Sequence, residues 1–266
     1  MASSSDIHIS IAPETIFHFG QFEITNAMLG SILVCAVLCA VAIIAGGSVK
    51  KNSLPGKLQN AIEWYYVTIQ QSTSENIGSA SKARPYLGLV LTLFLFILLS
   101  SWLGLIPGVL HIGVVEADGV LAPIFRAPTT DLNATIALAL IAFITIQYAG
   151  FKSQGVKYLG KFFNFKNGPI NFYVGLQELI SELARLISFS FRLFGNIFAG
   201  EVLIVVLSSM SRIKIEEGPF AFLSAFGLPI PSFVILMEFF VAILQAYVFV
   251  TLMSVFISLA TEDSHH

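Results

Sequence analysis

The stretch SFSFRLFGNIFAGEVLIVVL, residues 188–207, puts the permanently charged guanidinium of Arg192 among large apolar and small side chains. The closest acidic residues are Glu201, nine positions later, and Glu182, ten positions earlier. A charged side chain at the centre of a membrane span costs roughly 2.5–3.5 kcal/mol on insertion scales. Snorkelling to the interface is a structural explanation for such a charge, but Arg192 has apolar turns on both sides. The segment therefore indicates a membrane helix in which the arginine has a function.

The composition of the whole chain supports a polytopic membrane protein. Hydrophobic residues make up 56% of the sequence and charged residues 11%, whereas soluble domains carry about 25% charged residues. The net charge of −2 gives no electrostatic basis for nucleic-acid binding. Cys35 and Cys39 lie four apart in an apolar run, a pattern that predicts neither a disulfide nor a metal site, and no cofactor is expected.

Five segments are apolar over the length that a spanning helix needs, about 20 residues. We therefore predict an all-α fold with a single transmembrane domain over residues 27–266, preceded by an N-terminal tail over residues 1–26. Asp131 is the predicted N-cap of the third helix. The tail has no Lys or Arg and no apolar core, so neither a signal peptide nor a transit peptide is predicted. The predicted spans are residues 27–46, 86–107, 132–150, 171–209 and 230–260.

The segment between the first two spans divides into two parts. Residues 55–71 have apolar side chains at helical spacing and predict an amphipathic helix at the membrane interface. Residues 72–84 are rich in serine and are predicted to form a polar loop.

Lys and Arg in the connecting segments predict the orientation of the chain. The N-terminal tail has none, residues 47–85 have five, residues 108–131 have one, residues 151–170 have four and residues 210–229 have two. The first and third connections are therefore predicted inside and the N-terminal tail outside. Five crossings then put the C-terminus inside.

The last two spans are too long to stand upright in a bilayer. At about 1.5 Å per residue, residues 171–209 would extend about 58 Å and residues 230–260 about 46 Å, against a hydrocarbon core of about 30 Å. We expect these helices to kink or to tilt strongly. A steep tilt would let a helix run alongside a large curved partner within the membrane.

The polar residues of the fourth span fall on one face, about 80° wide at about 100° per residue. Glu201 falls on the opposite side, and Glu238 and Gln245 share a face of the last span. Glu201 and Glu238 can therefore form a polar site between the two helices, separate from Arg192. This arrangement suggests two aqueous pockets with a cation between them. The residues of the polar face are Glu178, Ser181, Arg185, Ser188, Arg192 and Asn196.

Some of these polar residues also have structural interpretations. Glu178 and Glu182 could form ion pairs with Arg185 near the inner surface. Asn196 and Gln245 could be hydrogen-bonding residues between helices.

The motifs RLFGN (residues 192–196) and AGE (residues 199–201) resemble the signature of subunit a of the F-type (F1Fo) ATP synthase. The stretches QELISELARLIS, PTTDLN (residues 128–133) and LQAYVF (residues 244–249) also resemble that family. The similarity runs from about residue 27 to residue 261.

This resemblance implies a stator subunit that passes protons across the membrane against a ring of c subunits with buried carboxylates. The family's essential arginine falls on Arg192, which favours the ionised form of each passing carboxylate and separates two half-channels. The implied outer half-channel consists of Glu201, Glu238, Asn196 and Gln245, with Asp131 and His111 near its entrance. The inner one consists of Glu178 and Ser181. Some members of the family carry His where this chain has Glu238, so the outer site is here a carboxylate pair.

The resemblance also implies that the chain is not an enzyme by itself, that it contacts b-type peripheral stalk subunits and lipid, and that it lies in a bacterial inner membrane or, alternatively, a mitochondrial one. The choice between protons and sodium ions depends on the c ring. A proton-coupled secondary transporter, or the stator of another ion-driven motor, would also need charges in its spans. A transporter commonly has repeated halves and broken helices, and the sequence has neither.

Overall fold

The computed structural model describes residues 15–19, 22–48, 56–106, 113–115, 121–123, 126–160, 169–212 and 229–262. Five of its helices are long and apolar enough to cross a membrane, which confirms the predicted all-α polytopic fold. They are α1 (Asn26–Ser48), α3 (Ala80–Leu105), α4 (Leu132–Gln154), α6 (Pro169–Arg212) and α8 (Pro229–Thr261).

Short elements connect the long helices. Helix α2 (Lys57–Ile77) packs against α3 and α8, and the single-turn elements η2 (Pro128–Thr130) and α5 (Lys157–Gly160) flank α4. Two small antiparallel hairpins, which the sequence did not predict, complete the described residues. They pair β1 (Thr15–Phe19) with β2 (Phe22–Thr25), and β3 (Gly113–Val115) with β4 (Leu121–Pro123).

The predicted polar loop over residues 72–84 was wrong, because those residues are almost entirely helical. Helix α2 continues to Ile77, Gly78 takes a left-handed φ of 85°, and α3 begins at Ala80. A glycine in this conformation ends a helix without steric cost, and the Ser79 hydroxyl then accepts a hydrogen bond from the Lys82 amide at 3.3 Å as the N-cap of α3. The serines belong to helix turns and caps, so their polarity did not indicate a loop.

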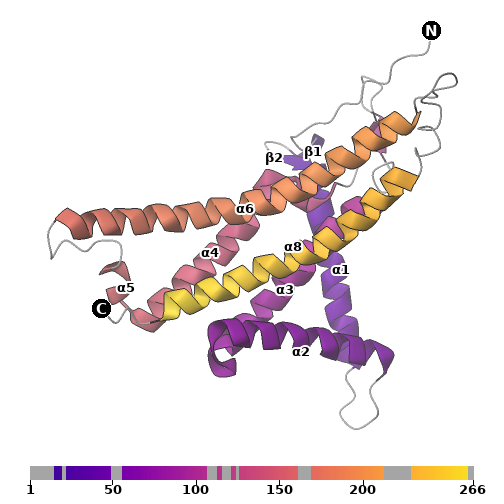
Figure 1. The fold of residues 1–266 in the computed structure, drawn as a ribbon. Helices are drawn as coiled ribbons and strands as arrows, with labels where there is room; N and C mark the ends of the chain where they lie inside the picture. The colour runs from indigo at the N-terminus through magenta and orange to yellow at the C-terminus, as the bar shows by residue number, and fades with distance from the viewer. Residues whose placement is uncertain are drawn as a thin grey trace.

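Helices α6 and α8 are each continuous, which confirms their predicted length. Helix α6 has 44 residues and α8 has 33, so they extend about 66 Å and about 50 Å. Figure 1 shows that the two helices approach each other over one half of their length and diverge over the other half, with α4 in the fork between them. Among the described helices, α6 packs mainly against α4 and α8, which leaves a long face of α6 that the described residues do not cover.

The core lies where α3, α4, α6 and α8 meet. Val90 and Ile97 of α3, Leu193 of α6 and Met253 of α8 are completely buried. Alanines fill the closest approaches, as is common between membrane helices: Ala139, Ala142, Ala242 and Ala246 are 0% exposed. Helix α1 is more peripheral, and Ile43 near its end is 75% exposed.

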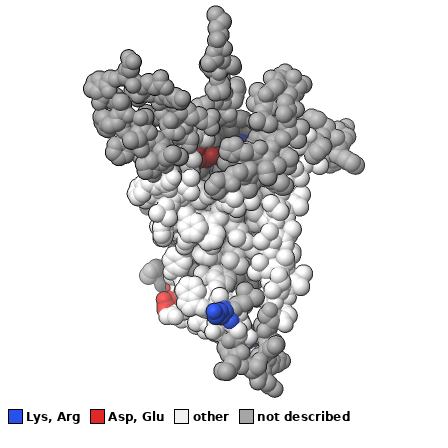
Figure 2. Space-filling model, turned by 90° about the vertical axis from the view of Figure 1, so that its right-hand side faces the viewer, with Lys and Arg blue, Asp and Glu red and all other residues white. Residues whose placement is uncertain are grey.

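The two ends of the helix assembly are fixed by different contacts. At one end, η2 contacts α1, α3, α4 and α6. At the other end, Gln154 of α4 donates to the carbonyls of Ala260 and Glu262, and Ser153 donates to the carbonyl of Thr261. In Figure 2 the broad middle of the described surface is uncharged, with red and blue side chains towards the ends. This distribution is typical of a protein surrounded by lipid.

Candidate functional site

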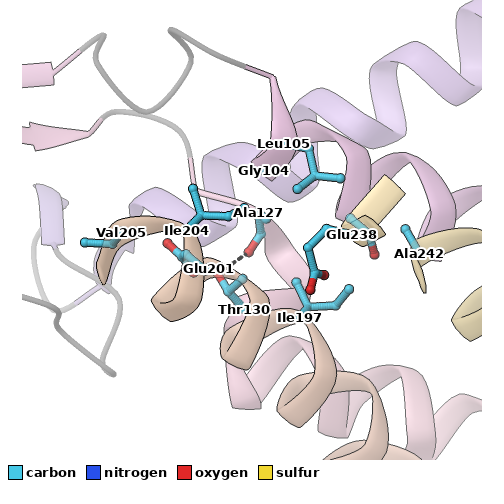
Figure 3. A pocket seen from close by; sticks show the side chains of 11 residues that line it. Gly104, Leu105, Ala127, Thr130, Ile197, Glu201, Ile204, Val205, Glu238 and Ala242 are labelled. Atoms are coloured by element: carbon cyan, nitrogen blue, oxygen red, sulfur yellow. Dashed lines mark hydrogen bonds between the residues drawn. The ribbon is translucent and has the colours of Figure 1, made fainter. Parts of the chain in front are cut away.

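A pocket between α3, η2, α6 and α8 contains the two predicted acids of the outer site. Glu201 of α6 and Glu238 of α8 both line it, and Figure 3 shows Thr130 and Ile197 between them. The structure therefore brings together two carboxylates that are 37 residues apart in the chain. The other lining residues are Ser101, Gly104, Leu105, Ala127, Ile204, Val205 and Ala242.

Gly200 makes the close approach of Glu238 to α6 possible. A Cβ atom at Gly200 would overlap the carboxyl group of Glu238, so only glycine leaves room for that carboxyl against the helix. The glycine of the AGE motif thus leaves room for Glu238 in the pocket that Glu201 also lines.

Arg126 belongs to the same site, although in the sequence it is only the single basic charge of a connecting segment, residues 108–131. Its side chain is 8% exposed, its Nε donates to Thr130 Oγ1 at 3.1 Å, and its Nη2 lies 3.9 Å from Glu201 Oε2. Its main-chain amide donates to the Asn26 carbonyl, and its own carbonyl packs against Gly30 of α1. Arg126 thus gives Glu201 a cationic partner from within the chain.

Asn196 and Gln245 join α6 to α8. Asn196 Nδ2 donates to Gln245 Oε1 at 2.8 Å, and Gln245 is 5% exposed. This is the interhelical hydrogen bond that was one of the two interpretations of these residues. Asn196 is itself exposed and lies four residues after Arg192, so the pair also lies between the outer pocket and the arginine along α6.

Arg192 is exposed on α6. Its Nη2 donates to Ser188 Oγ at 3.3 Å. No carboxylate of the described residues lies within salt-bridge distance of it. Large apolar residues on the neighbouring turns of α6 are also exposed, Ile187 by 57% and Phe191 by 56%.

A second acidic group lies nearer the start of α6. Arg185 Nη1 donates to Glu182 Oε1 at 2.8 Å, and its Nη2 lies 4.0 Å from Glu178 Oε1. The ion-pair interpretation of these three residues is therefore confirmed. Ser181, on the same face, is half-buried. Glu178 and Ser181 are thus neighbours on one helix, as predicted, and Glu178 also interacts with a cation.

Comparison of the chain with known proteins finds one matching family and several relatives. The model of the ATP synthase A chain family matches residues 28–258. ATP synthase subunit a of Geotalea daltonii is 33% identical over 243 residues, which cover 90% of this chain and 89% of the relative. ATP synthase subunit a of Campylobacter jejuni subsp. jejuni is 33% identical over 239 residues, covering 88% and 89%.

The chain belongs to the ATP synthase A chain family. It is accordingly the ion-translocating stator subunit in the membrane sector of an ATP synthase, and a multi-pass membrane protein. The match spans all five long helices and both acidic groups of this family member. Family membership also decides against a secondary transporter or the stator of an unrelated motor.

Asp131 and His111 were the predicted entrance residues of the outer half-channel in this family member. Asp131 is 7% exposed and is the N-cap of α4, as predicted: its Oδ1 accepts a hydrogen bond from the Asn133 amide at 3.0 Å. It directly follows η2, which contributes Thr130 to the pocket. His111 lies outside the described residues.

Proposed function

We propose that this subunit forms two proton half-channels that end on opposite sides of Arg192, against a rotating ring of c subunits. The outer half-channel consists of Glu201, Glu238, Asn196 and Gln245, with Asp131 and His111 near its entrance. The inner half-channel consists of Glu178 and Ser181. Protons enter and leave each rotor carboxylate through these two routes and do not pass directly between them.

The exposure of Arg192 within a membrane-spanning helix is the observation that carries this proposal. In a bilayer that face would expose a guanidinium to lipid, at a considerable cost. Since no carboxylate of the described residues forms an ion pair with Arg192, which donates to the neutral Ser188 hydroxyl, its counter-charge has to come from another chain. A carboxylate on each c subunit supplies that charge. The arginine favours the ionised form of the carboxylate, so each carboxylate gives up its proton before Arg192 and takes up another beyond it.

Buried polar atoms support a hydrated outer route. Glu201 Oε2 and Thr129 Oγ1 are buried and make no hydrogen bond with the described residues. Buried polar groups of this kind usually bind ordered water. A water-filled path that begins at η2 would reach Glu201 and Glu238 in the same pocket.

The remaining parts of the proposal concern the surroundings of the chain. It is not catalytic by itself and works with the c ring, with b-type peripheral stalk subunits and with the lipid bilayer. It lies in a bacterial inner (plasma) membrane, the organisms of the two relatives being bacteria; a mitochondrial inner membrane is the alternative. Residues 1–26 form an outer tail, of which residues 1–14, 20 and 21 lie outside the described residues, and residues 151–170, of which 161–168 lie outside them, are inside.

Labelling of a single cysteine tests the orientation. In a chain whose free Cys35 and Cys39 are replaced with serine, Ser153→Cys, on an exposed position at the end of α4, should resist a membrane-impermeant maleimide added outside sealed cells and react in inverted vesicles. Efficient labelling from outside would refute the orientation.

Replacement of the arginine tests the function. In a complex verified to contain the c ring, Arg192→Ala should abolish ATP synthesis driven by an imposed proton gradient. Without the cation, nothing favours the ionised form of each rotor carboxylate, so the carboxylates do not release their protons at this position. Normal coupled synthesis in this variant would overturn the proposal.

A further inference from the structure

Tyr158 of α5 is a buried tyrosine outside these half-channels, and it is only 1% exposed. A Cβ atom at Gly150 would lie 2.5 Å from its ring, and Phe151 packs edge-on with the ring centroids 5.1 Å apart. Burial, followed by the nearby charge of Glu182, raises the pKa of Tyr158 to about 12. Tyr158 therefore remains a neutral hydroxyl donor at physiological pH.

That hydroxyl begins a chain of hydrogen bonds that ends at an arginine. Tyr158 Oη donates to Gln147 Oε1 at 2.8 Å, and Gln147 Nε2 donates to Glu182 Oε2 at 3.1 Å. The other carboxylate oxygen, Oε1, accepts from Arg185 Nη1 at 2.8 Å. Since Glu182 is only 3% exposed, its carboxylate is held in one orientation by groups from α4 and α6.

Arg185 is held from other directions as well. Glu178 lies 4.0 Å from its Nη2, and the ring of Phe256 from α8 lies 4.8 Å from its Cζ. An aromatic ring at this distance attracts a guanidinium through a cation–π interaction. Charges and packing within the chain thus neutralise and position Arg185.

Arg185 and Arg192 nevertheless lie on almost the same side of α6. Seven residues separate them, which amounts to about 20° around the helix and about 10 Å along it. A rotor carboxylate that moves past this face could be attracted to either guanidinium. Two available cations would give the ionised carboxylate two resting positions.

We propose that Tyr158, Gln147 and Glu182 are positioning residues that keep Arg185 occupied within the chain, so that Arg192 alone of these two arginines binds the rotor carboxylates. This inference rests on the proposed function, because it requires carboxylates that pass α6. The same hydrogen bonds also connect α5, in the segment after α4, to α6, the helix that faces the rotor.

Paired variants of Glu182 and Arg185 test the proposal in the assembled complex. Glu182→Gln keeps the size of the side chain but removes the charge that occupies Arg185. We expect it to slow ATP synthesis about tenfold, the factor expected for the loss of one charge-assisted hydrogen bond. Glu182→Gln combined with Arg185→Gln removes the competing cation and should restore most of the rate. Rates are expressed per complex that retains its c ring.

Milder variants test the far end of the chain of hydrogen bonds. Tyr158→Phe keeps the ring against Gly150 and removes the hydroxyl, so it should cause a smaller loss that Arg185→Gln also relieves. Tyr148→Phe is the matched control, because Tyr148 is 58% exposed on α4, and it should leave the rate unchanged. If Glu182→Gln fails to assemble with the c ring, Tyr158→Phe alone is compared with Tyr158→Phe combined with Arg185→Gln, and the double variant is again expected to recover the rate.

A purely structural role for Glu182 predicts a different result. The double variant would then be as slow as Glu182→Gln, or slower, and this outcome would overturn the inference. Arg192→Ala, measured in parallel, separates the two proposals: if it retains synthesis, the proposed function fails. If it abolishes synthesis while the double variant shows no rescue, only the inference about Arg185 fails.

Discussion

Arg185 and Arg192 lie two turns apart on α6 and have opposite environments. Glu182 and Glu178 lie beside Arg185 and the ring of Phe256 lies against it, whereas Arg192 is exposed and donates to Ser188. A membrane chain usually pairs the charges it carries in its spans. The difference indicates that the first arginine is balanced within the chain and the second is kept available for a charge that another chain brings.

The third arginine near the site follows the same rule as Arg185. Arg126 lies beside Glu201 and is almost fully buried. Arg126 and Arg185 therefore have carboxylate partners at the two predicted half-channels. Along α6, Arg192 lies between Arg185 and Glu201, the partner of Arg126. The separation of the half-channels would then result from how these charges are paired.

The largest difference between the two arginines is expected when each is replaced with lysine in a separate variant. Lysine keeps the charge but lacks the planar fork and the weak hydration of guanidinium. Arg192→Lys should lower ATP synthesis by about two orders of magnitude, because the interaction that it removes is made during proton transfer. Arg185→Lys should change the rate by severalfold at most, since its partners can still hold an ammonium. Equal losses in the two variants, measured per assembled complex, would remove the distinction between the arginines.

A smaller effect is expected in the outer pocket. Glu238→Gln keeps the shape that fits against Gly200 but cannot take up a proton. Because Glu201 in the same pocket can still carry one, proton flux should fall about tenfold, less than the roughly 10²–10⁴-fold typical of a lost acid–base group. Glu63→Gln is the matched control, because Glu63 is exposed on α2. The measurement is ATP-driven proton pumping into vesicles over a range of pH. Unchanged flux throughout that range would exclude Glu238 from the pathway.

The smallest effect concerns the face that carries Arg192. A Cβ atom at Gly195 would contact nothing within 4 Å, and the same holds for Gly88 of α3. Replacing either glycine with alanine adds helix propensity worth up to about 1 kcal/mol. Gly195→Ala should nevertheless slow synthesis severalfold, because the added methyl group meets the rotor, whereas Gly88→Ala should not. Identical rates in the two variants would mean that this part of α6 does not approach the rotor closely.

Much of the helical fold could be predicted from the sequence, because long apolar runs have few alternatives in a bilayer. The start of α4 at Leu132 followed from the Asp131 cap and the length of α6 from hydropathy, although hydropathy left open whether α6 would kink. Spacing along a helix also indicated that Glu201 lies away from Arg192. These features depend on residues that are close together in the chain.

Contacts between distant segments could not be predicted in the same way. Arg126 reaches Glu201 across 75 positions, and Tyr158 reaches Glu182 through a glutamine of α4. Neither residue lies in a motif that indicates its partner. The only signal for Arg126 was that it is the single basic residue of residues 108–131.

Passive proton leak through the Arg192→Ala variant tests the central claim most directly. Vesicles containing the assembled membrane sector, with the c ring verified, are given a proton gradient in the absence of ATP. If Arg192 separates the half-channels, the alanine variant should lose the gradient faster than the unmodified chain, and Arg192→Lys should leak less than alanine. An arginine needed only for structure would instead cause loss of the c ring. An assembled alanine variant that holds the gradient as well as the unmodified complex would contradict the claim.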